Sequence, residues 1–401
     1  MKKKSLIGLG ALVASAAVLA SALPAQAFTP TISEVRYLAG PTEDDWGDSW
    51  YDLALTSDAA TAVWSTDTGT FIVDVASNTA TTIAGSEGGN SIILDPTGTY
   101  AYLAEETGVM SDTGTIFKVD MATKAIVATW LVDTANSSSH MFFSADGSSL
   151  FVLGATGSWP NTEVAVAKVN LSSGVVTTYE EGNSGFYPSQ PAYDTASGLI
   201  YIPTSDTATG NAWSWNVFDT ASNTFSDLAW TDSGELSYCD FQSGVLACLV
   251  DDTVDYVATI DATGGVVSSV NVDTAVSDAD SVTLTPDGTQ AYVYGDDGGF
   301  NNVELIDLTT MSSVLVLNLS TDYQNVVRMA PDAGQIWFTA DYVRDYDGGY
   351  QVVQFAEAKA TLADTGLDST ATAVTAVSLG AAGVLLLGLY RARRRVATSA
   401  K

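Results

Sequence analysis

Leu94-Asp-Pro-Thr-Gly-Thr-Tyr-Ala-Tyr-Leu103 is one of three similar stretches that decide the fold of this chain. The other two are Phe143-Ser-Ala-Asp-Gly-Ser-Ser-Leu-Phe-Val152 and Leu284-Thr-Pro-Asp-Gly-Thr-Gln-Ala-Tyr-Val293. Each contains a short apolar run, a turn rich in Asp and Gly, and a second apolar run with β-branched or aromatic side chains. These patterns are typical of β-hairpins and not of helices.

Weaker copies of the same hairpin occur at residues 55–64, 192–201, 240–248 and 329–337. A second phrase, a strand that runs into a turn, recurs between the hairpins at Phe71–Asn78, Ile116–Thr123, Trp215–Ser222, Val257–Gly264 and Val303–Thr310. Seven hairpin copies recur at a mean spacing of about 46 residues, which is close to the period of four-stranded propeller blades. The sequence therefore predicts an all-β fold over residues 28–360, a seven-bladed β-propeller of four-stranded antiparallel blades.

The last copy of the repeat has too few strands. Residues 326–330, 335–339 and 350–355 supply three strands, and the C-terminal segment begins directly afterwards. At the other end, residues 31–38 form an apolar strand that has no partners before it in the chain. We therefore expect residues 31–38 to complete the last blade, because this pairing places both ends in one sheet and removes an open edge.

The repeated phrases also resemble those of a known family. Thr285-Pro-Asp-Gly-Thr-Gln-Ala-Tyr-Val293 and Val257-Ala-Thr-Ile-Asp-Ala-Thr-Gly264 are similar to the repeats of YVTN/WD40-like seven-bladed β-propellers. The resemblance covers nearly all of residues 28–360. It implies the fold and says little about activity, because this architecture carries many functions.

The N-terminus has the three parts of a secretory signal peptide. Lys2, Lys3 and Lys4 form a charged region, residues 6–22 are apolar and small, and Ala25-Gln26-Ala27 is an A-x-A cleavage site. The sequence thus predicts a signal peptide over residues 1–27 and an exported chain that begins at Phe28.

The C-terminal segment, residues 361–401, predicts attachment to the cell surface. Leu362-Ala363-Asp364-Thr365-Gly366 is followed by an apolar stretch at residues 374–390 and by Arg391-Ala-Arg-Arg-Arg395. The stretch is just long enough for a hydrophobic anchor helix, and the arginines after it fit the positive-inside rule. The alternative is an ordinary membrane anchor that follows an accidental LADTG.

The order of these parts resembles the L-P-x-T-G sorting signals of Gram-positive surface proteins. Ala363 stands in place of the proline, as in the L-A-x-T-G variant used by class E sortases. The resemblance implies that a class E-like sortase cuts between Thr365 and Gly366 and joins Thr365 to peptidoglycan or to a pilin. It places the protein at the cell wall of a Gram-positive bacterium, after a transient membrane-anchored precursor.

The exported part is strongly acidic. The whole chain has a formal charge of −32. Residues 28–365 contain 46 of the 47 acidic residues but only 7 of the 15 basic residues, which gives this part a charge of −39. No basic patch can be assembled from so few scattered cations, so nucleic acid is excluded as a partner.

Two cysteines face each other across a predicted hairpin. If Ser243 and Gly244 form a two-residue turn, residues 242 and 245 close it and Cys239 lies opposite Cys248. Such a pair lies within the distance range of a disulfide, and an exported chain permits the bond. The alternative is two buried free thiols.

Antiparallel blades place their loops alternately on two faces. The turns within the hairpins are short, whereas the loops on the other face are long, varied and acidic, at residues 43–50, 105–112, 154–161, 295–300 and 341–349. Function on a rigid scaffold usually lies in such loops. Asp341, Asp345 and Asp347 are candidate calcium ligands, since hard cations bind several oxygen atoms; otherwise the loops are a solvated acidic surface.

The aromatic residues of these loops suggest a ligand face. Trp46, Trp50 and Trp159 could stack on a sugar or bind a partner protein, although propeller aromatics more often lie between blades. His140 is the single histidine of the chain, so His-based triads and multi-histidine metal sites find no support.

We expect a binding or adhesion module for an extracellular protein or glycan, and not an enzyme. No cofactor is indicated apart from the calcium considered above. The alternatives are an exported lactonase-like or hydrolase-like propeller that uses loop carboxylates, and a passive scaffold of the envelope.

Overall fold

β-strands joined by short turns make up nearly all of the part of the chain that the structure describes. The computed structural model is described for residues 31–36, 50–66, 69–86, 91–106, 114–134, 140–157, 162–184, 186–188, 190–206, 213–228, 230, 234–273, 276, 278–296, 301–318, 327–331, 334–343 and 346–354. Among these residues no helix is both long and apolar enough to cross a membrane. The predicted signal peptide, anchor helix and sorting signal lie outside the described residues.

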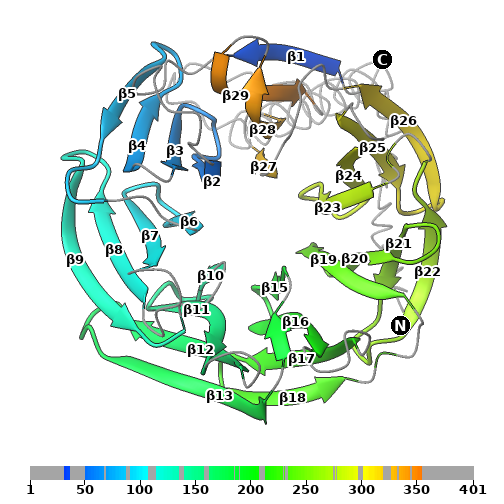
Figure 1. Cartoon of the computed structure of the whole chain (residues 1–401), viewed down its shortest axis with the longest axis horizontal. Coiled ribbons are helices and arrows are strands. Elements are labelled where there is room, and N and C mark those ends of the chain that lie inside the picture. The colour runs from blue at the N-terminus through cyan, green and yellow to red at the C-terminus, as the bar shows by residue number, and fades with distance from the viewer. Residues whose placement is uncertain are drawn as a thin grey trace, which may run out of the picture. The chain divides into compact units, whose positions relative to one another are not determined.

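The strands form seven antiparallel sheets that stand in chain order around a central axis (Figure 1). Sheet 1 contains β2 (Trp50–Leu55), β3 (Thr61–Thr66), β4 (Gly69–Asp74) and β5 (Thr79–Thr82). Sheet 2 contains β6 (Ser91–Leu94), β7 (Tyr100–Glu106), β8 (Gly114–Asp120) and β9 (Ala125–Val132). Sheet 3 contains β10 (His140–Phe143), β11 (Ser149–Thr156), β12 (Glu163–Asn170) and β13 (Val176–Ser184).

The remaining sheets repeat this plan. Sheet 4 contains β14 (Phe186–Pro188), β15 (Ala192–Asp194), β16 (Leu199–Asp206), β17 (Trp213–Asp219) and β18 (Thr224–Leu228). Sheet 5 contains β19 (Glu235–Gln242), β20 (Val245–Asp251), β21 (Tyr256–Ile260) and β22 (Val266–Asn271). Sheet 6 contains β23 (Asp278–Leu284), β24 (Gln290–Asp296), β25 (Asn301–Asp307) and β26 (Ser312–Asn318). Sheet 7 contains β27 (Val327–Ala330), β28 (Gln335–Val343), β29 (Tyr346–Gln354) and β1 (Thr31–Arg36).

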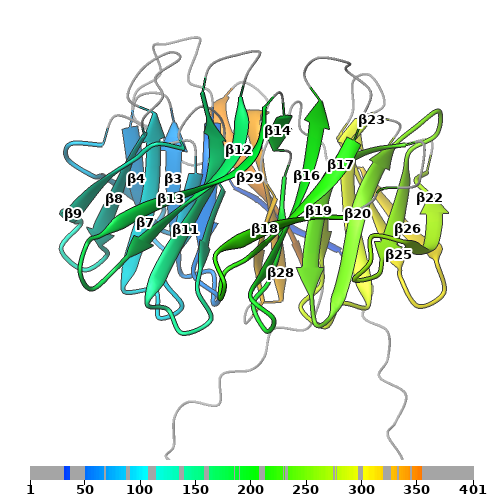
Figure 2. The same ribbon diagram turned by 90° about the horizontal axis from the view of Figure 1, so that it is seen from below.

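The architecture is a β-propeller. In sheets 1 to 6 the first strand along the chain lies near the axis and the last lies at the perimeter (Figure 1). In sheet 7, β27 lies near the axis and the N-terminal strand β1 lies at the perimeter. The sheets stand side by side when the ring is viewed edge-on (Figure 2). Sheet 4 differs because its inner strand is in two pieces, β14 and β15, which both pair with β16. The predicted all-β propeller with four-stranded antiparallel blades is thus confirmed.

Strands from the two ends of the chain share sheet 7. The N-terminal strand β1 pairs antiparallel with β29, from Thr31 opposite Gln354 to Arg36 opposite Tyr350, with an irregularity between Ile32 and Glu34. The free edge of β29 is thereby covered by main-chain hydrogen bonds. This is the pairing that the missing fourth strand predicts.

One predicted loop is largely strand in the structure. The sequence analysis expects a loop at residues 341–349, but β28 continues to Val343 and β29 begins at Tyr346, with these two residues paired. The aromatic and β-branched residues of this stretch favour extended backbone, which outweighs the acidic residues and glycines. The expected loop at 341–349 is therefore wrong.

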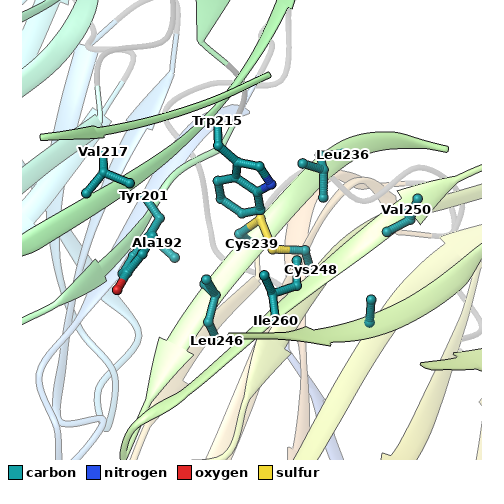
Figure 3. Close-up of a cluster of buried hydrophobic side chains, with 11 residues drawn as sticks. Ala192, Tyr201, Trp215, Val217, Leu236, Cys239, Leu246, Cys248, Val250 and Ile260 are labelled. Carbon is teal, nitrogen blue, oxygen red and sulfur yellow. A yellow bond between two sulfur atoms is a disulfide. The ribbon is translucent and has the colours of Figure 1, made fainter. Parts of the chain in front are cut away.

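Apolar side chains fill the space between neighbouring sheets. Buried residues form a separate cluster at each junction of two consecutive sheets. Figure 3 shows the junction of sheets 4 and 5, where the Trp215 indole lies beside the disulfide of sheet 5. Fully burying one large apolar side chain contributes about 1.5–3 kcal/mol, so each sheet depends on both of its neighbours.

Aspartates build the turns between the third and fourth strands. Asp74, Asp120, Asp219 and Asp307 each end a strand and accept backbone N–H groups two or three residues further on, at 2.8–3.3 Å. The residue four positions later has a positive φ in all four turns. Backbone hydrogen bonds are the main reason that the pKa values of Asp74, Asp120 and Asp219 are lowered. At Asp307 the Thr309 hydroxyl contributes most to the lowered pKa. These four aspartates therefore stabilise the turns that they begin.

A two-residue turn sets the register of the cysteine hairpin. Ser243 and Gly244 have φ values of 50° and 85°, and Gln242 pairs with Val245. Positive φ at both positions is typical of a type I′ turn. Cys239 consequently lies opposite Cys248, with the Cα atoms 4.1 Å apart and the two sulfur atoms bonded.

Deletion of residues 31–36 from the full chain is expected to lower the melting temperature. The deletion exposes the edge of β29, where each lost hydrogen bond contributes about 0.5–1.5 kcal/mol. Differential scanning fluorimetry measures the change, and an added peptide of residues 28–38 should restore part of the loss in a concentration-dependent manner. An unchanged melting temperature, or no response to the peptide, contradicts the pairing of β1 with β29.

Candidate functional site

The buried carboxylate of Asp52 joins two sheets near the propeller axis. Asp52 lies on the inner strand of sheet 1 and is 4% exposed. Its Oδ1 atom accepts the backbone N–H of Leu53 at 2.7 Å, and its Oδ2 atom accepts that of Ile92, on the inner strand of sheet 2, at 2.6 Å. An inner strand has no ladder partner on the side of the axis, so its N–H groups need another acceptor.

A cation from sheet 7 completes this junction. The guanidinium of Arg328, on β27, donates a hydrogen bond to Asp52 Oδ1 and forms an ion pair with it. Burial raises the pKa of Asp52, while the charge of Arg328 and the two amide donors act in the opposite direction. Asp52 thus links the inner strands of sheets 7, 1 and 2, which is where the two ends of the ring meet.

Asp240 repeats this arrangement on the other side of the axis. It lies on the inner strand of sheet 5, and its Oδ1 accepts the N–H of Phe241 at 2.7 Å. Its Oδ2 accepts the N–H of Leu284, on the inner strand of sheet 6, at 2.8 Å. Burial raises the pKa of Asp240, and amide donors and Arg328 oppose the shift. Each of these two carboxylates binds the inner strand of the following sheet.

His140 is the first residue of β10, the inner strand of sheet 3. Burial lowers the pKa of His140 to about 4, and the positive charge of Arg328 adds to this effect. The imidazole is therefore neutral at neutral pH. Nothing in the sequence indicates that this histidine lies near Arg328.

Asp52, Asp240 and Arg328 are charged side chains on inner strands, and His140 on β10 is neutral. The hydrogen bonds of the two carboxylates hold neighbouring sheets together. The carboxylates of Asp52 and Asp240 each accept two backbone N–H groups, and Asp52 also accepts Arg328. A general acid or base must reach the substrate proton that it transfers. Carboxylates already engaged by main-chain donors are suited to holding sheets together instead.

A cavity of about 410 Å³ opens at the inner turns of sheets 7, 1 and 2. We call it the turn cavity; residues 55–58, 60–61, 94–98, 329 and 331 line it. The partly buried side chains of Leu55, Leu94 and Met329 each pack against a different core cluster. The cavity is thus the place where three inter-sheet cores end.

The equivalent turns of sheets 5 and 6 are in direct contact. Ser243 Oγ donates a hydrogen bond to the carbonyl oxygen of Pro286 at 2.8 Å. Gly288 has a φ of 69°, and a Cβ atom there would lie 2.6 Å from the carbonyl oxygen of Gln242. Such close approach requires glycine and leaves no space between these two turns.

The predicted ligand residues lie largely outside the described residues. Trp46, Trp159 and Asp345 are outside them, as are Leu362, Ala363, Asp364, Thr365 and Gly366 of the predicted sortase motif. The backbones of Trp50, Asp341 and Asp347 lie in strands, but their side chains are not described. Within the described part of the chain, no group of three or more His, Cys, Asp or Glu side chains could hold a metal ion.

The comparisons with known proteins support the fold. No family model and no curated protein matches the chain. Among solved structures, hydrazine synthase of Kuenenia stuttgartiensis has a TM-score of 0.56 and 13% identity, covering 76% of this chain and 96% of that chain. The Cps50 (Swd1) β-propeller domain of Myceliophteria thermophila has a TM-score of 0.55 and 11% identity, covering 81% and 99%.

The chain is therefore a β-propeller protein with a WD40-like fold. At sequence identities of 13% and 11%, these similarities are evidence for the fold alone and not for a shared function. The closer relationship to YVTN proteins stays a prediction from the repeated phrases.

Replacement of His140 by Gln is expected to reduce the loss of stability at acidic pH. Between pH 6.5 and about 4 the unfolded chain binds a proton that folded His140 does not, so the free energy of unfolding falls as the pH falls. Between pH 7 and pH 4.5 the contribution is about 2–3 kcal/mol, since one pKa unit corresponds to about 1.4 kcal/mol and this range covers most of the shift.

Urea unfolding of the wild type and of His140→Gln at pH 7 and pH 4.5 measures this difference. The carboxylates of Asp52 and Asp240 are present in both proteins, so their own titration largely cancels. Equal losses of stability in the two proteins would show that His140 titrates as it does in water.

Proposed function

We propose that the protein is an exported propeller, linked to the cell wall, that binds a ligand outside the cell. The observation that carries the binding role is the use of the axial carboxylates, because Asp52 and Asp240 hold neighbouring inner strands together. A ring fixed in this way presents its turns and loops on a rigid frame, which favours recognition of a ligand over acid–base catalysis.

The two ends of the sequence support the proposed location. Ala25-Gln26-Ala27 fits a signal-peptide cleavage site, and Leu362-Ala363-Asp364-Thr365-Gly366 precedes an apolar stretch and a basic tail. The Cys239–Cys248 disulfide agrees with export, because disulfides persist in oxidising surroundings. In this proposal a class E-like sortase transfers Thr365 to peptidoglycan or to a pilin.

Replacement of Thr365 by Ala is expected to leave the protein in the membrane fraction of the producing cell. Alanine keeps the backbone carbonyl that the sortase attacks but lacks the threonine side chain of the motif, so the sortase no longer recognises the segment. The apolar segment and the arginines then retain the chain. Cell fractionation with immunoblotting measures the distribution, and Thr361→Ala, one position before the motif, serves as the matched control.

The wild type and the Thr361→Ala control should require a muralytic enzyme for release. Release of the wild-type protein by detergent alone would contradict covalent attachment to the wall and would favour an ordinary membrane anchor.

A further inference from the structure

The turn cavity combines an apolar interior with an acidic rim. Leu55, Leu94 and Met329 are partly buried on their inner strands, whereas Asp58 and Thr97 are exposed in the turns that follow the inner strands of sheets 1 and 2. No aromatic side chain is among the lining residues, so the cavity lacks the stacking surface that a sugar ring prefers. Its chemistry instead fits a group with a hydrocarbon stem and a positively charged end.

Two carboxylates at the rim are held in place by their own turns. Asp58 Oδ1 accepts the Thr56 hydroxyl at 2.7 Å and the Ala60 N–H at 3.0 Å. Asp95 Oδ1 accepts the Tyr100 N–H at 2.7 Å, and its Oδ2 accepts the Thr97 hydroxyl at 2.6 Å. A carboxylate offers about four acceptor positions, so both groups keep capacity for a further donor.

Asp58 is charged at neutral pH. The N–H of Ala60 and then the hydroxyl of Thr56 lower the pKa of this carboxyl group. The rim therefore presents fixed negative charge over an apolar interior. The surrounding chain adds to the attraction, because residues 28–365 carry a charge of −39, and such a field concentrates cations near the surface.

We propose that the turn cavity binds the side chain of a lysine or arginine from an extended segment of an extracellular partner protein. The alkyl part of the side chain packs on Leu55, Leu94 and Met329, and the cationic end meets Asp58 and Asp95. Long basic side chains pair an apolar stem with a charged tip in this manner. The proposal rests on the proposed binding function and assigns it a site at the inner turns of sheets 7, 1 and 2.

The test uses the full chain in non-ionic detergent and four fluorescent peptides with blocked ends. The peptides share a glycine–serine backbone and carry a central lysine, arginine, norleucine or glutamate. Fluorescence anisotropy at low salt is expected to show binding of the lysine and arginine peptides, weaker binding of norleucine and none of glutamate.

Two double variants separate the cavity from the general charge of the protein. Asp58→Asn with Asp95→Asn removes both rim charges and keeps the Oδ1 acceptors, and it should weaken lysine-peptide binding at least about tenfold. The control, Asp146→Asn with Asp120→Asn, makes the same change in charge at turns of sheets 3 and 2 away from the cavity. Asp146 accepts hydrogen bonds from the Ser144 hydroxyl and from the N–H and hydroxyl of Ser148. Asp58 accepts similar hydrogen bonds from its own turn.

The outcomes are distinct. Equal binding by wild type and the rim variant, or equal weakening by the rim variant and its control, overturns the proposal. If the rim variant does not fold, Thr97→Trp replaces it, because a large side chain at this exposed lining position fills the cavity. This variant should abolish binding of the lysine peptide, and retained binding overturns the proposal. Loss of this site leaves the wall attachment untouched, so the two proposals fail independently.

Discussion

The ring has no free end, and the rest of the structure depends on this constraint. Each sheet buries apolar side chains against the sheet before it and the sheet after it, so a missing neighbour would expose a full face of core residues. Sheet 7 receives three strands from the end of the chain and its fourth from residues 31–36. The main-chain pairing of β1 with β29 therefore holds together two segments more than 300 residues apart in sequence.

The junction at which the ring closes also has the most distinctive chemistry of the described residues. Asp52 accepts a backbone amide from sheet 2 and the guanidinium of Arg328 from sheet 7, so one carboxylate spans three sheets. Just beyond these residues in sequence, the inner turns of the same sheets surround the turn cavity. The contacts that stabilise the closure thus also fix the walls of the proposed ligand site.

Much of the fold could be predicted because its signals are local. The Asp-Gly turns and alternating apolar residues give the strands, and the Ser243–Gly244 turn gives the register of Cys239 and Cys248. The strand Thr31–Arg36 was identifiable from a simple deficit of strands in the last repeat. At residues 341–349, by contrast, acidic residues and glycines suggested a loop, although the intervening Tyr and Val residues continue the strands.

The candidate site could not be predicted, because its contacts join residues that are distant in sequence. Asp52 stands among other acidic residues, and nothing near it indicates that its partners are Ile92, 40 positions away, and Arg328, 276 positions away. The short inner turns suggested little space for a ligand. Whether a cavity forms depends on how neighbouring turns approach one another, as the closed contact between Ser243 and Pro286 shows.

Hydrogen exchange of the intact chain, followed by mass spectrometry, tests the closure most directly. If the ring is closed by β1, amides in Thr31–Arg36 should exchange about as slowly as those in Val266–Asn271, the outer strand of sheet 5, because both strands are paired on one side. Amides in Tyr346–Gln354 should be protected like those in Tyr256–Ile260, which are paired on both sides. Exchange of Thr31–Arg36 as fast as that of the exposed turns, together with weak protection of Tyr346–Gln354, would contradict the account.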